Sequence, residues 1–502
     1  MSVRKSASYI LGGSFFSKIV SFVGSIFLAR ILFPEDYAYI LIANIFTGLV
    51  QILSDVGFEN YYLQARFKNH EEEDETLRIT SFLRLGLNTL LFVIQFVISY
   101  VVEYYYREVI VGQLLRVFSL NYLIVGIGVT SQFILRKELN FKPEAVANVF
   151  RDIVGTAVKI AFAIQGFGAL SFGMGSLAGS FVRVLIIMKA KFYLPYTLHW
   201  DKVVFNKIIF FGKHSFVGGV GLYFVRQADK FLLSRFFPRE IVGFYSFSES
   251  QASIAYSYLV QPLNGLFLSF SAKYKENKEY LYSVLIKISF LISAILLPLT
   301  ILLFFFSNEI FFYVFGEKWM GAVTLFRLFL VYNYTIAFVE PVSGVLTAFG
   351  FPDINAKLIW ARGVALVVFL SMAAVFNLPI IVYAGVFLII SFLFTWIKAY
   401  LCIKKMEGTL IGYLLSQKAA LYSAFLNCVT LFIVSILVDE LLIRIVLSGL
   451  GVVLIFFVIN VVMFSTEFLG AIKLLIGNNI LGKRIFLVVE KTSSTIISRF
   501  KK

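Results

Sequence analysis

The chain contains 502 residues, of which 59% are hydrophobic and 15% are charged, and its formal net charge is +16. Soluble domains carry about 25% charged residues, so this composition excludes a soluble globular protein and indicates a polytopic membrane protein. The positive charge does not indicate a nucleic-acid partner, because Lys and Arg collect in the cytoplasmic loops of membrane proteins.

Apolar segments long enough to cross a bilayer recur along the chain with short breaks between them. The first has a basic start but no small-residue cleavage site, so we interpret it as a retained helix and not as a signal peptide. The narrowest breaks are residues 165–168 and 377–379. We predict an all-α protein with about 14 transmembrane helices, at residues 6–31, 36–63, 77–102, 109–135, 143–165, 168–190, 206–234, 241–270, 280–306, 320–349, 355–378, 379–403, 414–437 and 441–465.

The basic residues of the loops predict the orientation of these helices. With the N-terminus in the cytoplasm, most of the loop Lys and Arg residues fall on the cytoplasmic side, as the positive-inside rule requires. An even number of helices then brings the C-terminus back to the cytoplasm. Residues 466–502 form a basic tail, which we expect to lie on the inner leaflet.

A short internal repeat predicts two similar halves. Phe27-Leu28 and Phe33-Pro34, at the end of the first helix, match Phe231-Leu232 and Phe237-Pro238, at the end of the seventh. Six helices separate the copies, so both halves have the same orientation, and a substrate site is expected between them. We predict a first six-helix lobe at 1–195, a second at 196–405, two additional helices at 406–465 and the tail at 466–502.

Cations recur inside the predicted helices, where a charge is costly unless it faces a partner or a watery cavity. Lys18, Lys159 and Arg226 lie deep, and for them a cavity is favoured. Arg84 lies near a cytoplasmic end, so snorkelling to the interface explains it equally well. The candidate substrate-binding cations are Lys18, Arg84, Arg116, Arg151, Lys159, Arg226, Lys230 and Arg327.

Polar side chains also form stripes on single helix faces. Arg226, Asp229 and Lys230 are spaced i, i+3 and i+4, so Asp229 either neutralises its neighbours or takes part in ion coupling. Small and polar residues in such stripes serve equally for helix packing. Two more stripes are Asn44, Gly48, Gln51 and Asp55, and Asn148, Asp152, Gly155 and Lys159. The candidate sodium- or proton-coupling acids are Asp55, Asp152, Asp229, Glu249 and Glu340.

The balance of these charges predicts the kind of substrate. Intramembrane cations outnumber acids, which suits an anionic group such as a pyrophosphate or an acidic sugar, and Arg can clamp phosphate through paired hydrogen bonds. Tyr223 and Tyr245 are candidates for stacking on sugar rings, although ordinary packing explains them as well.

Motifs for catalysis or metal binding are absent from the sequence. Gly477–Arg484 resembles a phosphate-binding loop, but Arg484 replaces the hydroxyl residue that holds magnesium. The three histidines and two cysteines have no metal-ligand spacing, and no disulfide framework is expected. We therefore expect neither an enzyme nor a metal site, and no cofactor beyond a coupling ion.

Several short motifs, in order, carry a family resemblance. They are Gly12-Gly13 with Lys18, the turn Arg30–Tyr37, Leu53–Phe58, Arg226–Asp229, Gly243–Tyr245 and Gln261–Leu263. With them the chain resembles the polysaccharide transporter, or Wzx-type flippase, family of the multidrug/oligosaccharidyl-lipid/polysaccharide exporter superfamily. Ala38 stands where that family usually has Gly.

The resemblance implies two six-helix lobes related by a pseudo-two-fold axis, with two extra helices, around a central cavity. It implies alternating access that flips an undecaprenyl-pyrophosphate-linked oligosaccharide, a unit of O-antigen, capsule or exopolysaccharide, across the bacterial inner membrane. Membrane lipids and a polysaccharide polymerase are the expected partners of a monomeric transporter.

Two alternatives remain open. A multidrug cation antiporter of the same architecture requires an acidic cavity, against which the excess of Lys and Arg argues. A membrane-bound polymerase or ligase requires a large external loop, and the sequence contains none.

Overall fold

A computed structural model of the chain describes residues 3–54, 62, 69–193, 221–261, 267 and 270–464. The secondary structure of these residues is helical, without strands. Asp55, Lys213, His214 and the predicted tail at 466–502 lie outside the described residues.

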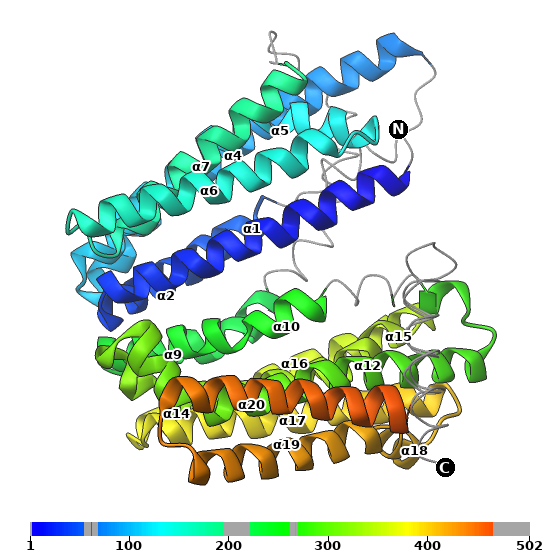
Figure 1. Cartoon of the computed structure of the whole chain (residues 1–502). Coiled ribbons are helices and arrows are strands. Elements are labelled where there is room, and N and C mark those ends of the chain that lie inside the picture. Colours follow the sequence, from blue (N-terminus) through cyan, green and yellow to red (C-terminus); the bar gives the residue numbers. More distant parts are fainter. Residues whose placement is uncertain are drawn as a thin grey trace. The chain divides into compact units, whose positions relative to one another are not determined.

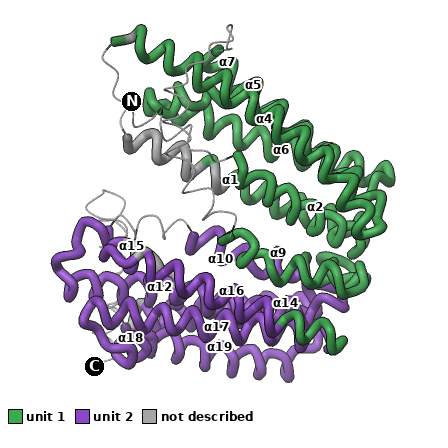
Figure 2. Tube along the Cα trace, turned by 180° about the vertical axis from the view of Figure 1, so that it is seen from behind, with its two compact units in different colours: residues 1–247, 313–319, 370–377 green, residues 248–312, 320–369, 378–502 purple. Residues whose placement is uncertain are grey.

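The helices fall into two compact units (Figure 2). Unit 1 consists of Met1–Phe247, Tyr313–Trp319 and Leu370–Asn377, and unit 2 of Ser248–Phe312, Met320–Phe369 and Leu378–Lys502. The lobe boundaries predicted from the sequence repeat stay a prediction.

Unit 1 is built mainly from long helices that pack along one another, with α6 against α1 and α7, and α5 against α2, α4 and α7 (Figure 1). Its core between α2, α4 and α5 includes Ile42, Val102, Leu114 and Phe118. The helices are α1 (Val3–Ile31), α2 (Pro34–Ile52), α4 (His70–Tyr106), α5 (Val109–Lys137), α6 (Lys142–Ile164), α7 (Leu170–Ala190), a helix at 221–236 and most of α9 (Arg239–Ala252).

Unit 2 packs α12 against α14 and α19, and α14 against α17. Its main elements are α10 (Ile254–Leu259), α12 (Lys278–Phe305), α14 (Val323–Val339), α15 (Ser343–Ala348), most of α16 (Pro352–Val375), α17 (Ile380–Lys405), α18 (Leu410–Leu415), α19 (Lys418–Leu437) and α20 (Leu441–Phe456). Shorter pieces are α13 (Ser307–Glu309), η3 (Glu340–Val342) and η4 (Phe457–Met463). Two further pieces, η1 (Ile310–Phe315) and η2 (Glu317–Ala322), are each divided between the two units.

Every predicted span coincides with helical residues in the described part of the chain. Both narrow breaks are confirmed, because the backbone turns left-handed at Gly166 (φ 85°), Gly168 (φ 52°) and Asn377 (φ 51°). Among the described residues, nine helices are long and apolar enough to cross a membrane by length and composition. Helix α6 is not one of them, since its apolar part carries Arg151, Asp152 and Lys159.

Two predicted spans are interrupted in the structure. The span predicted at 241–270 divides at Ser253, between α9 and α10, where the Ser253 hydroxyl donates to the Ser250 carbonyl at 2.9 Å. The span predicted at 320–349 contains a 3₁₀ turn at Glu340–Val342, because Pro341 lacks the N–H that continues an α-helix.

The repeated Phe-Leu…Phe-Pro pattern stands at equivalent helix ends. In the first copy α1 ends at Ile31 and α2 begins at Pro34, and in the second the helix at 221–236 ends just before Pro238. Asp36 fixes the first turn by accepting hydrogen bonds from the backbone N–H of Phe33 and of Ala169, each at 2.9 Å. One carboxylate thus joins the start of α2 to the start of α7.

At the same end of unit 1, the indole of Trp319 is buried. Trp319 donates from Nε1 to the Ala29 carbonyl at 2.9 Å, and its ring stacks on Phe247 with centroids 4.0 Å apart. Arg30 donates from Nε to the Val314 carbonyl at 2.7 Å. The Arg30–Tyr37 motif therefore has a structural role at this turn.

Candidate functional site

A polar pocket of about 340 Å³ lies within unit 1, among α2, α4, α5 and α7. Apart from Phe118 and Val125, every lining residue that the structure describes carries a polar group, and among these Arg84 is the charged one. Such groups are costly inside an apolar bundle unless water or a ligand satisfies them. The lining residues are Asn44, Thr47, Gln51 and Ser54 from α2 and its end, Arg84 and Asn88 from α4, Phe118, Asn121, Tyr122 and Val125 from α5, and Ser176 and Ser180 from α7.

The α2 stripe forms one wall of this pocket. Asn44, Thr47 and Gln51 are spaced i, i+3 and i+7, so they project from one face. Gly48 of the same stripe instead faces Tyr223, whose hydroxyl donates to the Ile45 carbonyl. The stripe therefore serves both a pocket and a helix contact within unit 1.

Hydrogen bonds hold the other walls in place. Asn88 donates from Nδ2 to the Arg84 carbonyl at 3.0 Å, and Asn121 donates to the Phe118 carbonyl at 3.2 Å. The Ser176 hydroxyl lies 3.5 Å from the Asn121 amide oxygen. Because these bonds run mainly within single helices, the amides are oriented before any ligand binds.

Arg84 is the cation of the pocket. Its Nη1 donates to the carbonyl of Ser54, which connects α4 to the end of α2. The side chain thus lines the pocket while one N–H is used in the protein, and snorkelling alone does not describe it.

Other predicted cations of unit 1 contact partners inside the unit. Arg116 pairs with Glu103 at 2.9 Å and lies over the Tyr100 ring, 4.7 Å from its centroid. The Lys159 ammonium lies 4.9 Å from the centroid of the Phe172 ring. Lys18 is half-buried on α1. None of these three lines the pocket.

The α6 stripe is used largely for contacts between helices. Asp152 accepts a hydrogen bond from the Ser17 hydroxyl of α1 and lies 2.8 Å from the guanidinium of Arg151. Asn148 accepts from Arg183 of α7 at 3.0 Å. The packing interpretation of this stripe is therefore the one that the contacts favour.

The side chains of Arg226, Asp229 and Lys230 differ in their exposure. Arg226 is exposed, Lys230 is half-buried and Asp229 is only 2% exposed. The Asp229 carboxylate accepts a hydrogen bond from the buried Tyr245 hydroxyl of α9 at 2.8 Å. Tyr245 is thereby committed to protein packing, and stacking on a sugar ring is not the role of this side chain.

The other predicted site residues do not come together in one site in the described part of the chain. In unit 2, Arg327 donates from Nε to the Ser307 hydroxyl at 2.6 Å. Glu249 is half-buried, also in unit 2. Glu340 stands in the 3₁₀ turn before Pro341, and its side chain is outside the described ones. Within the described ranges, no three His, Cys, Asp or Glu side chains group as a metal site would require.

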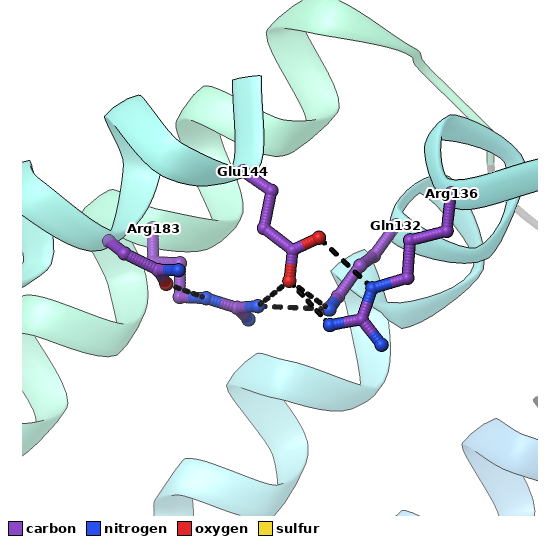
Figure 3. A network of polar contacts seen from close by, with 5 residues as sticks. Gln132, Arg136, Glu144 and Arg183 are labelled. Atoms are coloured by element: carbon purple, nitrogen blue, oxygen red, sulfur yellow. Dashed lines mark hydrogen bonds and ion pairs between the residues drawn. The ribbon is translucent and has the colours of Figure 1, made fainter. Parts of the chain in front are cut away.

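Sequence reasoning missed a polar network between α5, α6 and α7 (Figure 3). Glu144 receives a two-pronged contact from Arg136, with Nε–Oε2 at 3.0 Å, and a hydrogen bond from Gln132 at 2.8 Å. Arg183 lies 3.7 Å from Glu144 and bonds Gln132 at 2.9 Å and Asn148 at 3.0 Å. Glu144 starts α6 and Arg136 ends α5, where each charge also suits the helix dipole.

Comparison with known proteins decides the family. The model of the family described as "Polysaccharide biosynthesis protein" matches residues 27–324, which is well over half of the chain. The chain belongs to this family. The resemblance carried by the short motifs is thereby confirmed.

Two relatives show the breadth of the family. Teichuronic acid biosynthesis protein TuaB of Bacillus subtilis is 25% identical over 368 residues, covering 70% of this chain and 73% of the relative. Lipopolysaccharide biosynthesis protein WzxC of Escherichia coli is 23% identical over 332 residues, covering 66% of each chain.

Solved structures confirm the fold class. The lipid II flippase MurJ, in an inward closed conformation, superposes with a TM-score of 0.69 at 14% identity, covering 89% of this chain and 97% of that one. An inward-facing multidrug resistance MATE transporter superposes with a TM-score of 0.61 at 14% identity, covering 78% of this chain and 94% of that one. The chain thus shares the helical fold of these two proteins. The names of these two proteins describe a flippase and a transporter.

Proposed function

We propose that this protein flips a lipid-linked oligosaccharide, carried on undecaprenyl pyrophosphate, across the bacterial cytoplasmic membrane by alternating access. The observation that carries the proposal is the polar pocket of unit 1, which lies among the helices of a fold shared with a lipid II flippase. The names of the relatives, which refer to teichuronic acid, lipopolysaccharide and succinoglycan biosynthesis, support a polysaccharide precursor as the substrate.

Charge supports an anionic substrate over a cationic drug. Among the described lining residues Arg84 is positively charged and none is acidic, whereas organic cations bind best beside carboxylates. The likeness to MATE transporters concerns the fold, so it does not favour the antiporter alternative by itself.

Transport of such a substrate needs no nucleotide hydrolysis. A membrane potential contributes about 2.3 kcal/mol per charge per 100 mV, and a negative interior favours outward movement of anions. For a pyrophosphate with two net negative charges, the contribution is about 5 kcal/mol at 100 mV. Sodium or proton coupling, cytoplasmic termini, a monomeric state and a polymerase partner stay predictions.

The cationic path is tested in a strain whose own flippase has been deleted. We propose that Lys18, Lys159 and Arg226 contact the anionic headgroup along its path, because Arg226 is exposed and Lys18 and Lys159 are half-buried. Each change to Ala is expected to lower surface polysaccharide at least tenfold, since a charge-assisted hydrogen bond contributes about 1.5–3 kcal/mol. Surface polysaccharide and the amount of inserted protein are measured together.

Arg78→Ala is the matched control for these variants. Arg78 forms an exposed pair with Asp74 one helical turn away, so its loss should leave export unchanged. Full export by all three cation variants would contradict the cationic path.

A further inference from the structure

An ion pair joins α4 to α5 near the turn between them, and neither of its side chains lines the polar pocket. Arg116 of α5 donates from Nη2 to the Glu103 carboxylate of α4 at 2.9 Å, and the two side chains are 21% and 27% exposed. Arg116 lies seven residues after Val109, the first residue of α5, which is about 10 Å along a helix. The pair is therefore close to the membrane interface, where lipid headgroups lie.

Both members of this pair keep hydrogen-bonding capacity. A guanidinium has five N–H donors, and a carboxylate has two acceptor oxygens. Among the described residues, Arg116 donates a hydrogen bond to Glu103, and Glu103 accepts its hydrogen bond from Arg116. Because both side chains are partly exposed, a ligand at the surface of unit 1 can use the remaining donors and acceptors.

A glycine gives the Glu103 carboxylate its place. A Cβ atom at Gly112 of α5 would overlap the Glu103 carboxylate and would lie 2.9 Å from the Glu103 Cβ. Since position 112 carries no side chain, Glu103 lies against the backbone of α5 and reaches Arg116, one helical turn further along. The packing of the two helices thus fixes a positive and a negative group side by side.

Aromatic and apolar side chains of α4 continue this surface. Arg116 lies over the Tyr100 ring, 4.7 Å from its centroid, and Tyr104, one turn nearer the end of α4, is 87% exposed. Tyrosine rings collect at the membrane interface, and their faces attract ammonium groups. In the opposite direction, the exposed Phe96 and Val97 lead toward the hydrocarbon region and offer a surface for an acyl chain.

The charges of the surface match a zwitterionic headgroup. The Arg116–Glu103 pair has no net charge, so it attracts a purely anionic headgroup only weakly. A headgroup with both signs of charge can place its phosphate at Arg116, which binds phosphate through paired hydrogen bonds. Its ammonium group can then donate to Glu103 and lie over the Tyr104 ring.

We infer that Arg116, Glu103 and Tyr104 bind the headgroup of one phosphatidylethanolamine molecule, with an acyl chain along Phe96 and Val97. Ethanolamine carries the N–H donors that Glu103 accepts, whereas choline has none and glycerol has no positive charge. This lipid site goes beyond the proposed function, because it lies outside the polar pocket and requires no cargo.

The test is native mass spectrometry of the purified full-length protein, delipidated in detergent. An equimolar mixture of phosphatidylethanolamine, phosphatidylcholine and phosphatidylglycerol of different masses is titrated into it. Among protein molecules that retain a single lipid, we expect phosphatidylethanolamine at least tenfold more often than either competitor. The physical reason is the charge-assisted hydrogen bond from the ammonium group to Glu103.

Two isosteric variants separate the two charges. Glu103→Gln keeps an amide oxygen for Arg116 but removes the negative charge, so phosphatidylethanolamine and phosphatidylcholine should bind equally and phosphatidylglycerol should exceed both. Arg116→Gln should lower the retention of all three lipids at least tenfold. The matched control is Glu138→Gln, because Glu138 pairs with Lys191 at 2.7 Å near the other end of α5 and its loss should leave the preference unchanged.

Equal retention of phosphatidylethanolamine and phosphatidylcholine by the unmodified protein overturns the inference. A preference for phosphatidylethanolamine that survives in Glu103→Gln overturns it as well, since the ammonium group would then be bound elsewhere. Glu103→Gln alone distinguishes these outcomes, so the test does not depend on the folding of Arg116→Gln.

Discussion

Glu144→Ala is expected to destabilise the protein by about 3–5 kcal/mol, the usual effect of removing one partner from a buried ion pair. The Glu144 carboxylate is 14% exposed and lies between the Arg136 and Arg183 guanidinium groups (Figure 3). Without it, two cations at the α5, α6 and α7 contact repel each other. The measurement is the thermal unfolding midpoint of the purified protein in detergent.

Glu138→Ala is the control for this prediction. Glu138 pairs with Lys191 at 2.7 Å, but both side chains are more than 40% exposed, so the expected loss is below about 1 kcal/mol. Equal unfolding midpoints for the two variants would show that the Glu144 network contributes no more than a surface pair.

Gly243→Ala is the second change with a large expected effect. A Cβ atom at position 243 would lie 1.8 Å from the Pro34 carbonyl oxygen and 2.9 Å from the Pro34 Cα, and both are backbone atoms. The neighbour cannot rotate away, so α9 must move from the start of α2. We expect a loss of about 3 kcal/mol or more, at the upper end of overpacking costs, together with a lower yield of monodisperse protein in size-exclusion chromatography.

Gly385→Ala provides the comparison, because an added Cβ at Gly385 in α17 meets no atom within 4 Å. Alanine also favours a helix interior over glycine by about 1 kcal/mol, so this variant should be as stable as the parent or more so. If Gly243→Ala matched Gly385→Ala in yield and unfolding midpoint, the close contact between α9 and Pro34 would be absent in the protein.

The sequence predicted the helices well because each span must be long and apolar, and because Gly166, Gly168 and Asn377 mark narrow turns. It predicted less about which way each helix faces. The spacing of Arg226 and Asp229 places them on one side of a helix, but only the packing against α9 gives Asp229 its partner, Tyr245.

The residues of the pocket show the same limit of prediction from sequence, which is the direction that each helix faces. Asn44, Gln51 and Arg84 were recognisable as polar residues in apolar segments. Asn121 and Ser180 are identified as pocket residues only once it is known which faces of the four helices point toward one another. A polar residue in each of α2, α4, α5 and α7 is the signal that was available. The Glu144 network was missed for the same reason, since its members come from three helices.

The proposed function is tested most directly in sealed proteoliposomes that contain the purified protein and a labelled undecaprenyl-pyrophosphate-linked oligosaccharide confined to one leaflet. We expect the label to become accessible to an added glycosidase on the opposite side much faster than in protein-free vesicles, with an imposed potential accelerating the movement of the anion. Accessibility no greater than in protein-free vesicles, under every imposed potential and ion gradient, would contradict the account.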